Sequence, residues 1–292
     1  MNGERKAMNG GAVGRVKKLI VANPAGNITA FVLNAEDLTG EERRELAAAV
    51  LAREDLGVQQ LGFVRGPRRR DGLWRLDMAG GEFCGNAARA FGFYVACRDC
   101  LHGSSRVAVE MSGSAAPLVV ECTIEENRMW SGGESKGFSS AAMPLPQRRR
   151  LLVRANGEPA ALYAFEGICH VVSGDVTRRE EVFAELKTLA EAEVGAADAF
   201  GVLFHDGVSG LVTPLVWVRA LDTLVYESSC GSGAAAFACE YFATREDVEG
   251  GLWVKQPGGL LGVQILKLRG EVVALVLKGA VSLMEWPEAL KF

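Results

Sequence analysis

The chain has 292 residues, of which 49% are hydrophobic and 23% are charged, a balance typical of a folded protein and unlike that of a disordered one. Its net charge of −4 gives no support to a nucleic-acid partner, and no apolar run approaches the roughly 20 residues of a membrane span. We therefore expect a cytoplasmic protein that does not bind a membrane. Its seven cysteines, an odd number, favour reduced thiols over a disulfide framework.

The first half of the chain predicts short strands and two helices. Residues 1–18 are rich in Gly, Asn and Lys without periodicity, so a flexible extension is expected there. A helix is predicted over 41–56, opened by Thr39, and a second runs from the region of Cys84 to about residue 96. The strands predicted in this half lie at 19–22, 30–33, 61–64, 73–76, 107–109 and 118–120.

The second half repeats this order with variations. A helix is predicted over 178–193 and another after Cys230. The strands predicted here lie at 161–165, 170–172, 201–204, 215–218, 263–266 and 272–277. The pattern predicts an α+β fold of two pseudo-symmetric domains, each a curved sheet around a central helix, with the site in the cleft between them. The expected domains are 19–143, joined by a C-terminal strand at about 280–292, and 150–279.

Two runs of three arginines stand out in this chain of modest charge. Arg68–Arg70 and Arg148–Arg150 each follow a proline, and we interpret both as solvated loop charge rather than as a nucleic-acid site.

A cysteine motif occurs twice. Cys84-Gly85-Asn86 and Cys230-Gly231-Ser232 each precede an alanine-rich run that should begin a helix. The two cysteines lie 146 residues apart, half of the chain length, as in a duplicated domain. A thiol at a helix N-terminus should have a lowered pKa, because the backbone N–H groups and the helix dipole favour an anion there.

Two thiols that face each other can invert a stereocentre. One removes the α-proton of an amino acid from one face, and the other returns a proton to the opposite face. The pair should hold one proton between them, since two thiolates would repel each other. The backbone N–H groups of Gly85, Asn86, Gly231 and Ser232 could bind the substrate carboxylate at two converging helix N-termini. This chemistry needs no cofactor.

The paired motifs resemble those of the diaminopimelate epimerase family, the cofactor-independent two-thiol racemases. Pro24-Ala25-Gly26-Asn27 is similar to the early Gly-Asn turn of that family, and Gln59-Gln60-Leu61 to its Asp-Gln-Leu. Cys169-His170-Val171 resembles a stretch whose histidine pairs with the first cysteine. The resemblance implies catalytic roles for Cys84, Cys230 and His170, contacts of Asn27 and Gln60 with the substrate, a possible homodimer, and no cofactor. Glu227 is close to Cys230 and is a further candidate for the site.

The resemblance breaks down where the family grips the far end of diaminopimelate. By spacing, Leu221 and Asp222 stand where the Glu-Arg pair precedes the second cysteine; if Arg219 is instead the arginine, Val218 replaces the glutamate. A distal ammonium and carboxylate would then lose most of their partners. Met78-Ala79-Gly80-Gly81-Glu82 and Tyr226-Glu227-Ser228-Ser229 instead resemble the branch of histidine racemases that supply D-histidine to opine metallophores such as staphylopine.

Several alternatives remain open at the level of sequence. The chain could be a diaminopimelate epimerase or a racemase of another amino acid. It could be an isomerase that moves a double bond with a carboxylate base, although the second cysteine argues against this, or a binding module that has lost turnover. Cys97-Arg98-Asp99-Cys100 with His102 lacks a second pair to complete four zinc ligands, so no metal is expected.

Overall fold

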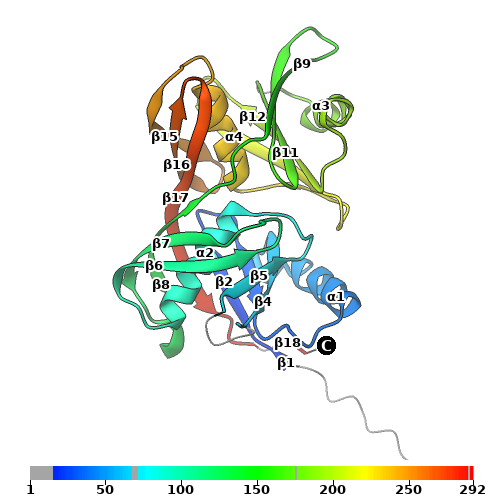
Figure 1. Cartoon of the computed structure of the whole chain (residues 1–292). Helices are drawn as coiled ribbons and strands as arrows, with labels where there is room; N and C mark the ends of the chain where they lie inside the picture. Colours follow the sequence, from blue (N-terminus) through cyan, green and yellow to red (C-terminus); the bar gives the residue numbers. More distant parts are fainter. Residues whose placement is uncertain (1–15, 68–71, 175, 289, 292) are drawn as a thin grey trace, which may run out of the picture.

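The computed structural model describes residues 16–67, 72–174, 176–288 and 290–291. Figure 1 shows two lobes, one above the other, with strand β17 (Glu271–Glu285) running through both. The expected extension, 1–18, lies largely outside the described residues, but β1 (Val16–Lys17) begins inside it and pairs with β18 (Leu290–Lys291). Residues 68–71, which include the first arginine run, and residues 289 and 292 also lie outside the described part.

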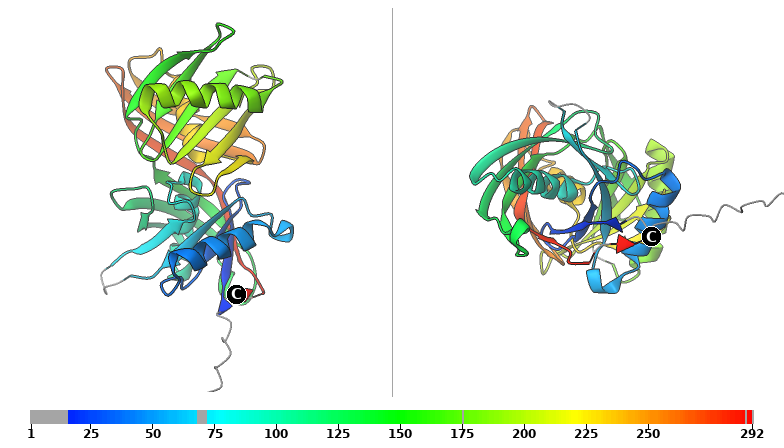
Figure 2. Two further views of the ribbon diagram at one scale, coloured as in Figure 1. Left: turned by 90° about the vertical axis from the view of Figure 1, so that its right-hand side faces the viewer. Right: turned by 90° about the horizontal axis from the view of Figure 1, so that it is seen from below.

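The lower lobe is a closed barrel around a helix. Strand β17 pairs with β2 on one edge and with β8 on the other, which closes a ring of eight strands. Figure 2 shows this ring curling round helix α2 (Gly85–Arg98). The other elements of the lobe are β2 (Leu19–Asn23), β3 (Thr29–Val32), α1 (Gly40–Leu51), η1 (Glu54–Leu56), β4 (Gln60–Arg65), β5 (Trp74–Met78), β6 (Gly103–Met111), β7 (Leu118–Glu126), η2 (Met129–Ser131) and β8 (Ser135–Ala142).

The upper lobe carries a six-stranded sheet and a second group of strands, in which β15 (Val248–Gln256) pairs with β16 (Gly259–Leu268) and β16 with β17. Helix α4 (Gly231–Tyr241) contacts both groups, and α3 (Arg179–Val194) covers the outer face of the six-stranded sheet. The remaining elements are β9 (Arg148–Val153), β10 (Pro159–Ala164), β11 (Ile168–Gly174), β12 (Ala199–His205), β13 (Val212–Val218) and β14 (Thr223–Tyr226).

The α+β fold expected from the sequence is confirmed, and so is a buried central helix in each half. Every residue of α2 from Gly85 to Cys97 is buried, because small alanines and glycines let the surrounding strands approach closely. At Gly92, for example, a Cβ atom would lie 2.4 Å from Cβ of Val120. We propose that the two lobes correspond to the domains expected at 19–143 and 150–279.

The interpretation of Arg148–Arg150 as a loop is wrong. These residues form the start of β9, the edge strand of the upper sheet, where long charged side chains can point to solvent while the backbone pairs with β10. Arg149 makes a two-point ion pair with Glu240, with N–O distances of 2.9 to 3.1 Å. The positive charge of Arg149 therefore has a partner within the fold.

Candidate active site

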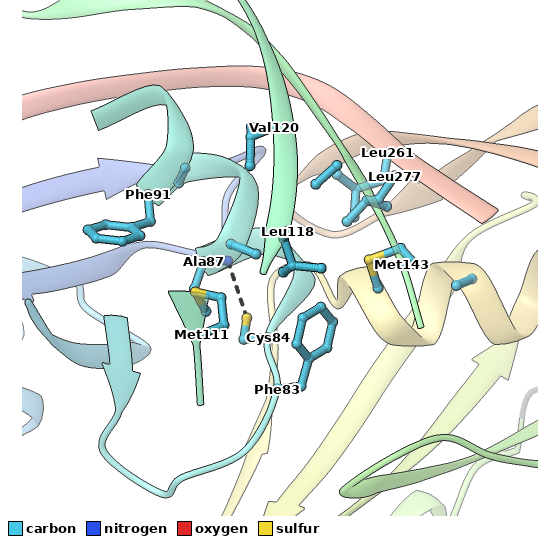
Figure 3. Packing of buried hydrophobic residues seen from close by; sticks show 14 of the residues in the cluster. Phe83, Cys84, Ala87, Phe91, Met111, Leu118, Val120, Met143, Leu261 and Leu277 are labelled. Atoms are coloured by element: carbon cyan, nitrogen blue, oxygen red, sulfur yellow. Dashed lines mark hydrogen bonds between the residues drawn. The ribbon is translucent and has the colours of Figure 1, made fainter. Parts of the chain in front are cut away.

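Cys84 is the N-cap residue of α2 and lies in the apolar core of the lower lobe. Its side chain is 7% exposed, and Figure 3 shows it among Phe83, Met111 and Leu118. The sulfur accepts the backbone N–H of Ala87 at 3.3 Å, as an N-cap side chain does, and donates to Oε1 of Gln60 at 2.9 Å. Hydrogen bonds to the start of α2 and to Gln60 on β4 therefore fix the position of the thiol.

Cys230 occupies the same position at the start of α4. Its backbone N–H donates to Oε1 of Gln256 at 2.6 Å, and Nε2 of Gln256 donates back to the Cys230 carbonyl at 3.2 Å. Its side chain is 6% exposed and lies 3.7 Å from Oγ of Ser232. Gln256 thus clamps the backbone of the second cysteine from β15.

The N-termini of the two helices converge. A Cβ atom on Gly231 would lie 3.2 Å from the backbone N of Asn86 and 2.6 Å from a methyl group of Leu277, so the absence of a side chain lets the two helix ends approach this closely. Nδ2 of Asn86 donates to Oγ and to the carbonyl of Ser229, at 3.1 and 3.3 Å, and Nδ2 of Asn27 donates to the same carbonyl at 2.5 Å. The structure therefore brings both cysteine motifs to one place.

The expectation of lowered thiol pKa values is wrong. Burial raises the pKa of Cys84 to about 12 and raises that of Cys230 well above its ordinary value, with the Glu227 carboxylate as the next cause in both cases. The N–H groups at each helix start act in the opposite direction but are outweighed. Both thiols are therefore protonated at rest.

Glu227 lies close enough to both cysteines to raise both of their pKa values. It is buried, its Oε1 accepts from Nε2 of Gln60 at 2.9 Å, and its Oε2 has no hydrogen-bond partner in the described part of the chain. Burial raises the pKa of Glu227 to about 7, although interactions with Cys230 and Gln60 favour the carboxylate. A carboxyl with this pKa can take or release a proton near neutral pH.

His170 lies beside the second cysteine motif rather than the first. Its Nε2 is 2.8 Å from Oγ of Ser232, so the pairing with Cys84 that the resemblance implies is not what this arrangement shows. The ring is fully buried, and burial lowers its pKa to about 3. Gly201 on the adjacent strand makes room for the ring, because a Cβ there would lie 2.5 Å from Nδ1 of His170. His170 is therefore neutral and positions Ser232.

The residues predicted from sequence gather in this region. They are Asn27, Gln60, Cys84, Gly85, Asn86, His170, Glu227, Cys230, Gly231 and Ser232. Sequence reasoning missed Ser229 and Gln256, which hold the second motif through backbone and side-chain bonds to distant elements. Ser229 precedes Cys230 directly, a signal that could have been used, whereas the approach of Gln256 depends on the fold alone.

A cavity of about 320 Å³ lies between the two lobes, and neither Cys84 nor Cys230 is among the described residues that line it. Residues of both lobes line it, including Gln60 and Glu82 from the lower lobe and Val218 and Glu227 from the upper. Gln60 joins this cavity to Cys84 through the 2.9 Å bond already described. Gln60 and Glu227 therefore link the cavity to the two cysteine motifs.

No group of three or more His, Cys, Asp or Glu side chains that could hold a metal ion occurs among the described residues. Nor does any helix in this part of the chain have the length and apolar character needed to cross a membrane.

A family model described as "Histidine racemase CntK N-terminal domain" matches residues 17–286. This chain belongs to the histidine racemase family. A histidine racemase of Fusobacterium nucleatum is 28% identical over 254 residues, covering 85% of this chain and 89% of that protein. A histidine racemase of Staphylococcus aureus is 26% identical over 245 residues, covering 81% and 84%. As a member of this family, the chain is an isomerase of the racemase and epimerase class.

Solved structures show the same fold at low sequence identity. A hydroxyproline epimerase of Agrobacterium vitis, with bound trans-4-hydroxy-L-proline, aligns with a TM-score of 0.62 and 11% identity over 95% of this chain and 93% of its own. A protein of Pseudomonas aeruginosa described as a "Predicted Epimerase" aligns with a TM-score of 0.60 and 12% identity, covering 94% and 99%. The two-lobed epimerase fold is therefore confirmed.

Proposed function

We propose that this protein racemises histidine without a cofactor, with Cys84 and Cys230 as the two acid-base groups. The observation that carries the proposal is the convergence of the two cysteine-capped helices, where a Cβ on Gly231 would meet the backbone N of Asn86 at 3.2 Å. A substrate α-carbon between the thiols would have a proton donor or acceptor on each face. The names of the relatives supply the amino acid.

The helix N-termini support binding of the substrate carboxylate. The first backbone N–H groups of α2 and α4 have no partner within their own helices. Those of Gly85, Asn86, Gly231 and Ser232 would donate to the carboxylate and stabilise the negative charge that spreads onto it when the α-proton leaves.

Glu227 supplies a destination for the first proton. Because both thiols are protonated at rest, one must lose its proton before it can act as a base. Glu227, with a pKa near 7 and an unpartnered Oε2, accepts that proton. The thiolate then removes the α-proton from one face, and the other thiol delivers its proton to the opposite face. Each cysteine serves as the base for one enantiomer and as the acid for the other.

Diaminopimelate fits this site less well. Leu221, which stands in place of the glutamate that holds the distal end of that substrate, lines the apolar part of the cavity. Asp222, which stands in place of the arginine, accepts the indole N–H of Trp217 at 3.0 Å, and as an acid it cannot pair with the distal carboxylate of diaminopimelate. We also propose, from the resemblance alone, that the D-histidine formed from L-histidine is used for metallophore synthesis.

Exchange of the α-proton with solvent tests the substrate. Each proteinogenic amino acid and diaminopimelate would be incubated with the protein in deuterated water, and loss of the α-proton signal followed by NMR. We expect rapid loss for histidine. Exchange on diaminopimelate alone would overturn the assignment of histidine, and no exchange on any amino acid would favour the binding module.

A further inference from the structure

Glu82 is a buried carboxylate that the proton-transfer steps do not use. It lies between β5 and α2, two residues before Cys84, and is 8% exposed. Its Oε2 is buried without a hydrogen-bond partner among the described residues. A buried carboxylate oxygen without a partner is costly, unless a ligand completes its hydrogen bonds.

The backbone around Glu82 is shaped to hold its carboxylate. A Cβ on Gly80 would lie 2.5 Å from Oε2 of Glu82 and 2.6 Å from a methyl group of Val218. Only glycine at position 80 leaves the carboxylate where it is. Burial raises the pKa of Glu82, although hydrogen bonds from the backbone N–H groups of Glu82 and Gly80 favour the carboxylate.

The cavity beside Glu82 has apolar walls and two acidic groups. Leu61, Val216, Val218 and Val225 are among its lining residues, and the charged residues that line it are Glu82 and Glu227. In the described part of the chain, no Lys or Arg lines it. Such a cavity favours a ligand group that is partly apolar, carries N–H donors and can be cationic, as an imidazole ring does.

We propose that Glu82 accepts a hydrogen bond from a ring N–H of the substrate imidazole and thereby determines the preference for histidine. This inference rests on the proposed function and names a specificity-determining residue for it. Gln60 borders the cavity and accepts from Cys84, and Glu82 lines the same cavity, so Gln60 connects the first thiol to the wall that carries Glu82. A substrate without a ring donor would leave Oε2 unpaired.

The Glu82→Gln variant tests this directly, because it keeps the size of the side chain and removes its charge. Racemisation of histidine would be measured together with inhibition by 3-(2-thienyl)alanine, which has a five-membered ring and no N–H. Glu36→Gln is the matched control, since Glu36 is exposed and accepts from the backbone N–H of Gly66 outside the cavity. Melting temperatures of both variants would establish that they are folded.

We expect Glu82→Gln to raise KM for histidine roughly 10- to 100-fold, the effect of losing a charge-assisted hydrogen bond. The kcat should stay within roughly threefold, because the bond is made equally in the ground and transition states. The inhibition constant of thienylalanine should not rise, and Glu36→Gln should behave as the unchanged protein does.

Two outcomes separate this inference from the proposed function. If the unchanged protein racemises histidine and Glu82→Gln keeps both its KM and its discrimination against thienylalanine, the role of Glu82 is wrong while the function stands. If the unchanged protein does not act on histidine, the proposed function fails first. Gly80→Ala provides a second variant, because the added methyl group would displace the Glu82 carboxylate and should raise KM in the same direction.

Discussion

The side chain of Asn86, at the start of α2, donates to both Oγ and the carbonyl of Ser229, the residue before Cys230. These two residues lie 143 positions apart in the chain. Both are fully buried, so the contact is shielded from water. Asn86 therefore sets the position of the second cysteine relative to the first, in addition to any contact that its backbone makes with a substrate.

Replacement of Asn86 by alanine should misalign the two thiols. We expect kcat to fall roughly 100-fold, because a small error in placing catalytic groups costs about that much. The free energy of unfolding should fall by about 1 to 3 kcal/mol, since Ser229 loses a buried partner. Steady-state kinetics and urea denaturation measure the two effects. Asn127→Ala is the control: Asn127 donates to the Cys97 carbonyl at 2.9 Å, at the far end of α2, and its loss should leave kcat unchanged.

The resting thiols should be slow to alkylate. Cys100 is exposed, whereas Cys84 and Cys230 are buried and protonated. Treatment with iodoacetamide at pH 8 should label Cys100 first, and labelling of Cys84 should continue to increase as the pH rises toward 12. Peptide mass spectrometry gives the rate at each cysteine. Rapid labelling of Cys84 or Cys230 at pH 7 without substrate would contradict the protonated resting state.

Glu227 should make activity and stability depend on pH in opposite directions. Because its pKa is raised to about 7 in the folded protein, the protonated form is favoured by folding. Its stabilising effect is complete below the ordinary carboxyl pKa and is lost as the pH rises through 7, a change on the order of 3 kcal/mol. Activity should increase over the same range, because ionised Glu227 accepts the thiol proton.

The Glu227→Gln variant should remove both pH effects. Its free energy of unfolding should fall less between pH 5 and pH 8, and its kcat should be low and lack the rise near pH 7. Titration of the histidine substrate also changes rates in this range, but it acts equally in every variant. Glu240→Gln, at the half-buried pair with Arg149, is the comparison. An unchanged pH profile in Glu227→Gln would exclude it as the proton acceptor.

Much of the fold followed from local sequence. Thr39 predicted the start of α1, and the structure shows the capping box in full: Thr39 accepts the N–H of Glu42, whose carboxylate accepts the N–H of Thr39. The strands missed by periodicity include β8 and β15, whose glycines and small polar residues give no alternation. The pairing of β8 is decided by the barrel, where Gly137 passes close to the Thr123 carbonyl, and that of β15 by its neighbour β16 in the upper lobe.

The parts of the site that could be predicted are those that belong to the repeated cysteine motif or to the family resemblance. Cys84 and Cys230 were found because the motif occurs twice, and Asn27 and Gln60 because of the family resemblance. The thiol pKa values could not be predicted, since they depend on burial and on the Glu227 carboxylate, and the sequence shows neither the burial nor that this carboxylate lies near both thiols. The partner of His170 depends on the register of β11 and β12 and on the approach of α4, which only the fold supplies.

Isotope incorporation tests the central proposal of two thiols on opposite faces most directly. L-histidine would be racemised in deuterated water, and both enantiomers separated and analysed by mass spectrometry at low conversion. We predict that the D-histidine formed carries deuterium at the α-carbon while the remaining L-histidine retains protium, with racemisation abolished in Cys84→Ser and Cys230→Ser. Deuterium appearing equally in recovered L-histidine would indicate a single base and would contradict the two-thiol mechanism.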